Sequence, residues 1–175
     1  MSSNLRHRMR EQAESVRLLL GDGQPLDADQ SGLSANVREM VRESLSRHEA
    51  LTAVFTELDR VGVGLTVKHW SGNQWAIFLP DASSPGKFRY QVFMANGWVS
   101  HFTFQTLDEA VSDAFDSGFR TVAPPETLDQ VASTIEWKKG CDRLELITQH
   151  NRGEISYSEM LDQFQQVDAK YASAA

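Results

Sequence analysis

The chain has little of what disulfide-bonded, secreted or membrane-bound proteins contain. Among its 175 residues there is one cysteine, Cys141, which excludes an internal disulfide framework. No apolar run approaches the roughly 18 residues of a membrane span. The polar start MSSNLRHRMREQAES lacks the apolar stretch of a secretory signal. These absences predict a cytoplasmic protein that does not bind a membrane.

Sequence signatures of enzymes are also missing. The chain has no Walker A loop, no Gly-x-Ser-x-Gly nucleophile motif and no His-Glu-x-x-His zinc motif. Its five histidines lack the spacing of metal ligands, and no histidine is placed by the sequence to act as a base for Cys141. We therefore expect no catalytic, cofactor-binding or metal-binding residues, and an enzyme without a recognisable motif is kept only as an alternative.

Charge is unevenly distributed along the chain, whose net charge is −7. Residues 62–105 carry 3 Lys/Arg against 1 Asp/Glu, whereas residues 106–175 carry 6 against 13. The acidic third is explained by a solvated helical surface, and two functional interpretations stand beside this one: a dock for a basic partner, or a mimic of nucleic-acid phosphate. The candidate acidic contacts are Glu145, Glu154 and Asp162.

The N-terminal third reads as two helices joined by a linker. Residues 1–20 form a helix or arm with apolar residues at three- or four-residue spacing, and residues 21–32 are a flexible linker of Gly, Pro, Asp and Ser without apolar periodicity. Ser34 can cap a second helix over residues 34–60. That helix is long for a globular protein, so a homodimer through residues 34–60 is an alternative to packing in the core.

Residues 33–175 read as a single α+β domain. β-branched and aromatic segments within residues 62–105 predict a three- to four-stranded antiparallel meander, since the strands follow one another closely. Residues 106–171 predict a C-terminal group of three to four helices. The first of these opens with a capping-box pattern, Thr106 with Glu109, and another is expected to begin after Gly140.

A predicted hairpin, RYQVFMANGWVSHFTF, contains the Asn-Gly turn signal. A two-residue loop of Asn96-Gly97 gives two mixed faces, because cross-strand partners share a face. A three-residue loop over 95–97 gathers apolar side chains on one face: Phe88, Tyr90, Val92, Met94, Trp98, Phe102 and Phe104. Burying each aromatic, at about 1.5–3 kcal/mol, outweighs a β-propensity range of about 1 kcal/mol. The sequence therefore predicts the three-residue loop, with Gly97 at positive φ and Trp98 on the core side, under the helix that follows the sheet.

The opposite face of the hairpin is amphipathic and is the main candidate for binding. In this register it carries Arg89, Gln91, Phe93, His101 and Thr103, beside two further cations of the sheet region, Lys68 and Lys87. Two arrangements fit the sequence. In one the face is exposed and meets a partner, and in the other a further helix covers it.

The sheet followed by the helix that opens FQTLDEA resembles the sheet–helix DNA-binding modules at the start of some phage-type integrases. The resemblance covers roughly residues 75–118 and implies contact with DNA through the sheet, but no family residue is carried across. Such modules read DNA with a basic sheet, and here only Lys68, Lys87 and Arg89 are available beside an acidic C-terminal third. Nucleic-acid binding through residues 62–105 is therefore expected to be weak.

Together these patterns predict a non-catalytic protein-binding or regulatory accessory protein without cofactors. The expected contact surfaces for its protein partner are the amphipathic hairpin face and the acidic C-terminal helices. Two alternatives stay open: a nucleic-acid-binding module that uses the sheet, and an acidic inhibitor that imitates nucleic acid.

Overall fold

The structure, a computed structural model, describes residues 2–19 and 34–172. The predicted linker at residues 21–32 lies outside the described residues. The described elements, in chain order, are α1 (Ser2–Leu19), α2 (Ala35–Val61), β1 (Thr66–His69), β2 (Trp75–Pro80), β3 (Phe88–Met94), β4 (Gly97–Phe104), α3 (Leu107–Asp116), β5 (Phe119–Val122), α4 (Thr127–Ser133), α5 (Ile135–Asn151) and α6 (Tyr157–Ala172).

The predicted α+β class with an antiparallel sheet is confirmed. Within the described part of the chain the sheet has five strands in the order β4-β3-β2-β1-β5. The prediction of three or four strands is wrong because β5 was not foreseen. This strand of four residues pairs with β1, Val67 opposite Val122, and such a long-range pairing leaves no local signal in the sequence.

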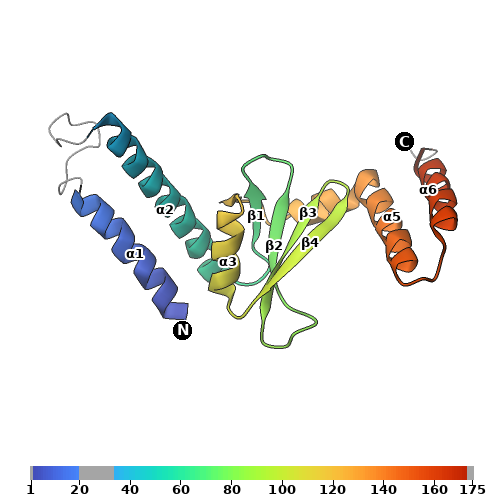
Figure 1. Cartoon of the computed structure of the whole chain (residues 1–175), viewed down its shortest axis with the longest axis horizontal. Coiled ribbons are helices and arrows are strands. Elements are labelled where there is room, and N and C mark those ends of the chain that lie inside the picture. The colour runs from blue at the N-terminus through green and yellow to red at the C-terminus, as the bar shows by residue number, and fades with distance from the viewer. Residues whose placement is uncertain (1, 20–33, 173–175) are drawn as a thin grey trace.

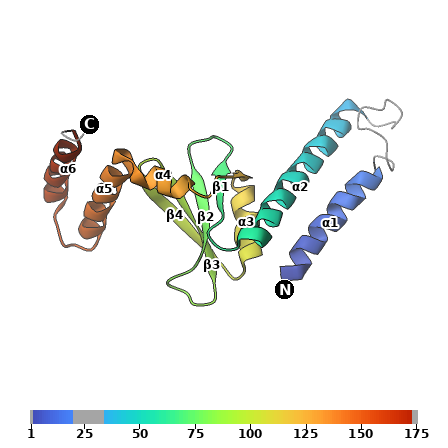
Figure 2. The same ribbon diagram turned by 180° about the vertical axis from the view of Figure 1, so that it is seen from behind.

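The molecule is elongated, with a helical hairpin at each end of the sheet (Figure 1). The antiparallel helices α1 and α2 form one end, and α5 and α6 form the other. The view from behind shows the same order, with α3 beside α2 and α4 leading across the sheet to α5 (Figure 2). The α1–α2 hairpin therefore packs beside α3 and β5, whereas the α5–α6 hairpin contacts α4 and β4.

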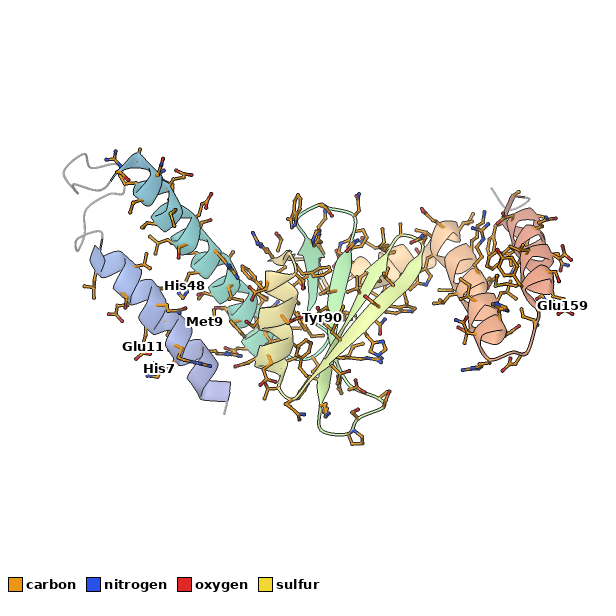
Figure 3. All side chains as sticks on the ribbon, viewed as in Figure 1. His7, Met9, Glu11, His48, Tyr90 and Glu159 are labelled. Carbon is orange, nitrogen blue, oxygen red and sulfur yellow. The ribbon has the colours of Figure 1, made fainter. Side chains whose placement is uncertain are left out.

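One face of the sheet carries the larger hydrophobic core, covered by α3 and the second half of α2. Its fully buried members include Val54, Phe78, Tyr90, Val111 and Phe115. Tyr90 lies between the sheet and α3 (Figure 3), and its hydroxyl donates a hydrogen bond to the carboxylate of Asp113 at 2.7 Å. Burial, followed by that hydrogen bond, raises the pKa of Tyr90. The expected packing of the helix after the sheet on the aromatic face is thus confirmed.

Helix α3 begins as its sequence predicts. The Thr106 hydroxyl accepts a hydrogen bond from the Glu109 backbone N–H, and the Glu109 carboxylate accepts one from the Thr106 backbone N–H, each at 3.2 Å. This reciprocal capping box satisfies two backbone donors that the first turn would otherwise leave free. The strong local signal explains why this helix start was predictable.

The other face of the sheet carries a smaller, aromatic core. Ile77, Phe93 and Trp137 are buried there, and the residues packed around them come from β2, β4, α4 and α5: Trp75, Leu79, Trp98, Leu128, Val131, Ala132 and Cys141. Helix α4 and the first turns of α5 therefore cover part of the amphipathic face. The sequence left open whether this face is exposed or covered by a helix. In this part of the face, helices cover the sheet.

The β3–β4 hairpin follows the predicted register away from its turn. Phe88 pairs with Phe104, Tyr90 with Phe102 and Val92 with Ser100. Nearer the turn the register shifts, so that Phe93 pairs with Trp98 and Met94 with Gly97. Val99 becomes the unpaired extra residue of a bulge, and Ala95-Asn96 form the turn.

The predicted loop and the position of Trp98 are therefore wrong, whereas the positive φ of Gly97 (+120°) is confirmed. Trp98 lies on the second face, where its ring is 5.7 Å from Phe93 and 5.1 Å from Trp137 between centroids. The bulge at Val99 reverses the alternation of side chains. It lets Phe102 and Phe104 stack on Tyr90 on one face while Trp98 packs, partly buried, on the other.

Gly140 lies inside α5 and does not precede a helix start, contrary to expectation. Helix α5 begins at Ile135 after the cap Thr134, whose hydroxyl accepts from the Trp137 N–H. A Cβ atom built on Gly140 would lie 1.7 Å from the carbonyl oxygen of Asn96. Glycine is therefore required here because the β3–β4 turn rests directly on the helix backbone.

Candidate interaction surfaces

The amphipathic sheet face is covered at one end and open at the other. Four of its predicted contact residues lie together as cross-strand pairs, Arg89 with Thr103 and Gln91 with His101. His101 and Thr103 are exposed, and Arg89 and Gln91 are partly exposed. Phe93 does not belong to this surface, because it is 0% exposed beneath Trp98 and Trp137. Placing Phe93 among the partner contacts was therefore wrong.

Asp81 sets the electrostatics at the open end of this face. Its buried carboxylate accepts hydrogen bonds from the Thr103 hydroxyl and from the backbone N–H groups of Ser83, at 2.7 Å, and Ser84, at 2.9 Å. The Thr103 bond is the largest cause that lowers the pKa of Asp81, and the charge of Arg89 adds to it. Asp81 is thus held as an anion that orders the turn before β3.

The polar groups above Asp81 are only partly satisfied. In residues 2–19 and 34–172, the buried Nε of Arg89 has no hydrogen-bond partner. Gln91 donates to the carbonyl oxygen of Ser100 at 3.1 Å, which anchors its side chain along β4. The open half of the face is therefore polar, with the guanidinium of Arg89 near the anionic Asp81 and the imidazole of His101 exposed.

The remaining predicted cations do not form one basic surface with Arg89. Lys68 lies on β1, opposite Trp75 of β2 and Thr121 of β5, and so two strands away from Arg89. Lys87 directly precedes β3 and is half-buried. Phosphate binding needs several cations along one surface, and the described positions of these three do not supply it.

The three predicted acidic contacts are exposed but do not form an acidic patch. Glu145 lies on α5, Asp162 on α6 and Glu154 in the connection between them, 3.9 Å from Arg152. Residues 135–172 hold seven acidic and five basic residues. Several of the acidic ones are paired: Asp168 lies 2.9 Å from Lys139 and 2.6 Å from Arg143, and Asp142 lies 2.7 Å from Lys170.

Most of the excess acid of the C-terminal third lies earlier, in and just after α3, where three carboxylates are bonded to other elements of the fold. Arg6 bonds Asp108, Arg47 bonds Asp116 and Tyr90 bonds Asp113. These carboxylates hold α1, α2 and β3 against α3. The charge excess read from the sequence is therefore largely structural.

The two edges of the sheet are protected to different degrees. Strand β5 has four residues, including Arg120; it packs against α2, and Pro124 and Pro125 follow it closely. Strand β4 has eight residues without Lys, Arg, Asp, Glu or Pro. Among the residues that the structure describes, no strand pairs with the outer edge of β4. Edge strands normally carry a charge, a proline or a bulge that discourages further pairing, and β4 has only the bulge at Val99.

Apolar side chains are exposed along the same edge. Val99 is 54% exposed as the bulge residue, and Phe102 is 47% exposed although its ring stacks on Tyr90 at 5.0 Å between centroids. His101 and Thr103 flank Phe102 along β4 and lie on the opposite face of the sheet, beside Gln91 and Arg89. The sequence indicated the polar residues of this surface but not that β4 is an open edge; the signal that could have found it is the long uncharged strand.

Groups suited to catalysis are not assembled in the described ranges. Cys141 is half-buried against the β3–β4 turn, and burial, followed by the charge of Asp142, raises the pKa of its thiol. Such a thiol stays protonated and is a poor nucleophile. No group of three or more His, Cys, Asp or Glu side chains could hold a metal ion within residues 2–19 and 34–172.

None of the described helices is both long and apolar enough to cross a membrane. Comparison of the chain with protein-family models, with curated proteins and with solved structures gave no significant match to any of the three.

Proposed function

We propose that this chain is a non-catalytic accessory protein that captures an extended segment of a partner protein along strand β4. The observation that carries this proposal is the outer edge of β4, which no described strand pairs with and which has neither a charged residue nor a proline, beside a half-open face that carries Arg89, Gln91 and His101. An extended segment added to a sheet edge gains affinity from main-chain hydrogen bonds. Its specificity comes from side chains that alternate between the two faces.

The two faces beside β4 set the chemistry of the partner segment. Side chains on the α3 face would lie beside the exposed ring of Phe102 and beside Phe104, which are apolar. Those on the other face would lie beside His101, Thr103 and the guanidinium of Arg89. A segment that alternates apolar and acidic residues fits both rows, because each row then meets a complementary neighbour.

The two alternatives have less support. Nucleic-acid binding through the sheet would need cations in one row, and Lys68 lies two strands from Arg89. An acidic mimic would need unpaired carboxylates in one surface, whereas Asp108, Asp116 and Asp168 are bonded within the fold. Each alternative nevertheless has a distinct outcome in the experiment.

The test is fluorescence anisotropy with synthetic eight-residue peptides that alternate apolar residues with either Glu or Lys. We expect the Glu peptide to bind and the Lys peptide to bind at least about tenfold more weakly, as expected for one or two charge contacts. Phe102→Lys, which supplies the missing edge guard, should abolish binding. His101→Glu should reverse the preference between the two peptides.

The matched control is Thr121→Glu, a similar exposed change on the opposite edge strand β5, which should leave the affinity for both peptides unchanged. Loss of binding in Thr121→Glu but not in Phe102→Lys would contradict the proposal, as would equal binding of the Glu and Lys peptides. A labelled DNA duplex that binds at low salt and is released by Arg89→Glu would instead favour the nucleic-acid alternative.

A further inference from the structure

Helices α5 and α6 form a hairpin that extends beyond the sheet and leaves a row of large apolar side chains uncovered. Leu144 and Ile147 of α5 and Tyr157 and Leu161 of α6 are between 38% and 61% exposed. The hairpin meets the sheet through the first turns of α5, and α6 packs against α5 (Figures 1 and 2). Helices of this kind ordinarily bury such side chains against a neighbour.

Contacts between the two helices define how they face each other. The ring centroids of His150 and Tyr157 are 5.9 Å apart at the connection, and Arg143 lies 5.4 Å from the ring centroid of Phe164 further along. Between these contacts, Leu146 of α5 and Met160 of α6 are buried in the middle of the hairpin. Side chains occupy the space between α5 and α6 in Figure 3.

The exposed apolar residues fall on one side of the hairpin. Ile147 and Leu161 each directly follow a buried residue, Leu146 and Met160, and are turned about 100° from it around their helices. Because the helices are antiparallel and both right-handed, this rotation carries Ile147 and Leu161 to the same side. Tyr157, four residues before Leu161, extends the row along α6. We call these residues, with Leu144, the hairpin apolar face.

Two acidic residues of the hairpin, Glu145 and Glu159, are directed away from this face. Glu145 and Glu159 each precede a buried residue, so the opposite rotation carries them to the other side. The charges that border the hairpin apolar face, Lys139, Arg143 and Asp168, are paired with one another. Glu136, on the same side of α5 as Ile147, and Asp162, which directly follows Leu161, are exposed at the rim of the face, so its apolar row is bordered by charge.

We propose that the hairpin apolar face binds a second copy of this chain, so that two α5–α6 hairpins form a four-helix bundle. In a two-fold symmetric dimer the same patch meets itself, and an uncharged apolar row is complementary to its own copy. The first turns of α5 rest against the sheet, so the free face consists of residues 142–151 of α5 and the 16 residues of α6, about 20 Å by 20 Å. That is roughly 400 Å2 before side-chain relief is counted, about two-thirds of the 600 Å2 or so that each copy buries in the smaller stable interfaces, so the dimer is expected to be weak.

The other candidate dimer interface, through residues 34–60, is at the opposite end of the molecule. Met40 is the most exposed apolar residue of α2 and is surrounded by charged neighbours, Glu39, Arg42, Glu43 and Arg47. Arg42 is already paired with Glu39 at 2.6 Å and Arg47 with Asp116, and an interface around Met40 would have to bury these pairs, which is costly unless the geometry is complementary. On α5 and α6 the charged residues lie beside the apolar row, so fewer of them would be buried. This inference does not depend on the proposed role of β4.

The test is sedimentation equilibrium of the full chain and of single variants. We expect a dimer for the unmodified chain, and a dimer weakened at least about tenfold in Ile147→Glu and in Leu161→Glu, because each places a carboxylate in an apolar interface. Leu161→Gln, which keeps a good helix former without a charge, should weaken the dimer less. Circular dichroism should show that the helix content of each variant is unchanged.

Two controls separate this interface from others. Val63→Glu changes a similarly exposed residue (45%) between α2 and β1, and it should leave the dimer intact, as should Met40→Glu. A monomer at all concentrations up to about 100 μM, well above the Kd of stable dimers, would overturn the proposal. A dimer that Met40→Glu dissociates and Ile147→Glu does not would overturn it as well. Peptide binding at β4 should persist in Ile147→Glu, so failure of one proposal is distinguishable from failure of the other.

Discussion

The helical hairpins at the two ends of the molecule are attached to the sheet in different ways. Helix α2 supplies Leu51, Val54, Phe55 and Leu58 to the larger core, so the N-terminal hairpin is part of the main hydrophobic cluster. Helix α5 is attached through Trp137 and the contact of Gly140 with the β3–β4 turn. One hairpin is thus integral to the core, whereas the other is a projection held at one end.

The polar contacts of the two hairpins also differ: those of the N-terminal hairpin reach the core, whereas those of the C-terminal hairpin stay at the surface. At the N-terminal end Arg6 bonds Asp59 at 2.8 Å and the buried Asp108 at 2.7 Å, and its guanidinium lies 4.4 Å from the Phe55 ring centroid. At the C-terminal end the ion pairs of Asp142 and Asp168 join α5 to α6 and lie at the surface. Exposed pairs contribute little because water and salt screen them. The C-terminal hairpin is therefore the part more free to change its neighbours.

A matched pair of leucine truncations should give the largest difference between the hairpins. Leu51 of α2 and Leu146 of α5 are 6% and 8% exposed, yet only Leu51 lies in the larger core. We expect Leu51→Ala to lower the free energy of unfolding by about 4 kcal/mol and Leu146→Ala by about 2 kcal/mol, the upper and lower parts of the range for such truncations. Urea unfolding measures both. Equal losses at the two sites would contradict the comparison.

Gly140→Ala should disrupt the attachment of the C-terminal hairpin. The added methyl group meets the carbonyl oxygen of Asn96 at 1.7 Å, so α5 must move away from the turn, at a cost of about 2–3 kcal/mol. Emission of Trp98 and Trp137, which are in ring contact, should report the separation. Alanine is the better helix former by about 1 kcal/mol, so a stabilised variant would show that the turn does not rest on α5.

Arg6→Ala should loosen the N-terminal hairpin. The substitution leaves the buried carboxylate of Asp108 without this partner, and we expect a loss of about 2 kcal/mol, below the value for fully buried pairs because Arg6 is itself 25% exposed. Thermal unfolding and hydrogen exchange of α1 measure the effect. The control Arg60→Ala removes the exposed pair with Glu57 in the same hairpin and should leave stability unchanged.

Acid should weaken the C-terminal hairpin by a small amount. Hydrogen bonds from Lys139 and Lys170 are the main causes that lower the pKa values of Asp168 and Asp142 below the ordinary aspartate value. A lowered pKa favours the folded state while the group is ionised. The contribution is therefore complete at neutral pH and is lost as the pH falls below about 3.9. Hydrogen exchange of α6 as a function of pH tests this.

The control for the acid effect is the double variant Asp142→Asn with Asp168→Asn, in which exchange of α6 should depend less on pH. Added salt should act in the same direction as acid in the unmodified chain, because both weaken exposed ion pairs. If the double variant keeps the full pH dependence, these two pairs are not its source.

Predictions from the sequence succeeded where a few adjacent residues decide the structure. The capping box of Thr106 and Glu109, the positive φ of Gly97 and the cross-strand pairs from Phe88 to Val92 were all confirmed. The register argument failed nearest the turn because it considered one core only. With a second core on the other face, a bulge at Val99 packs Trp98 against that core without exposing Tyr90.

The sequence predicted which residues form the candidate surface, but not which of them a helix covers. Arg89, Gln91, His101 and Thr103 lie together as the alternation of β3 and β4 requires. Phe93, from the same row, is buried because α5 places Trp137 over it, and no pattern within the hairpin shows which helix packs there. The exposure of the hairpin apolar face likewise leaves no signal in the sequence, since helical periodicity does not reveal what a stripe packs against.

The sequence by itself determined the class of the fold, the start of α3 and the hairpin pairing from Phe88 to Val92, because capping hydrogen bonds and side-chain alternation act between near neighbours in the chain. Only the tertiary structure decided which strands lie at the edges of the sheet, which half of its second face is covered and why position 140 is glycine. Those outcomes depend on contacts between segments far apart in the chain, such as Val67 with Val122 and Gly140 with Asn96.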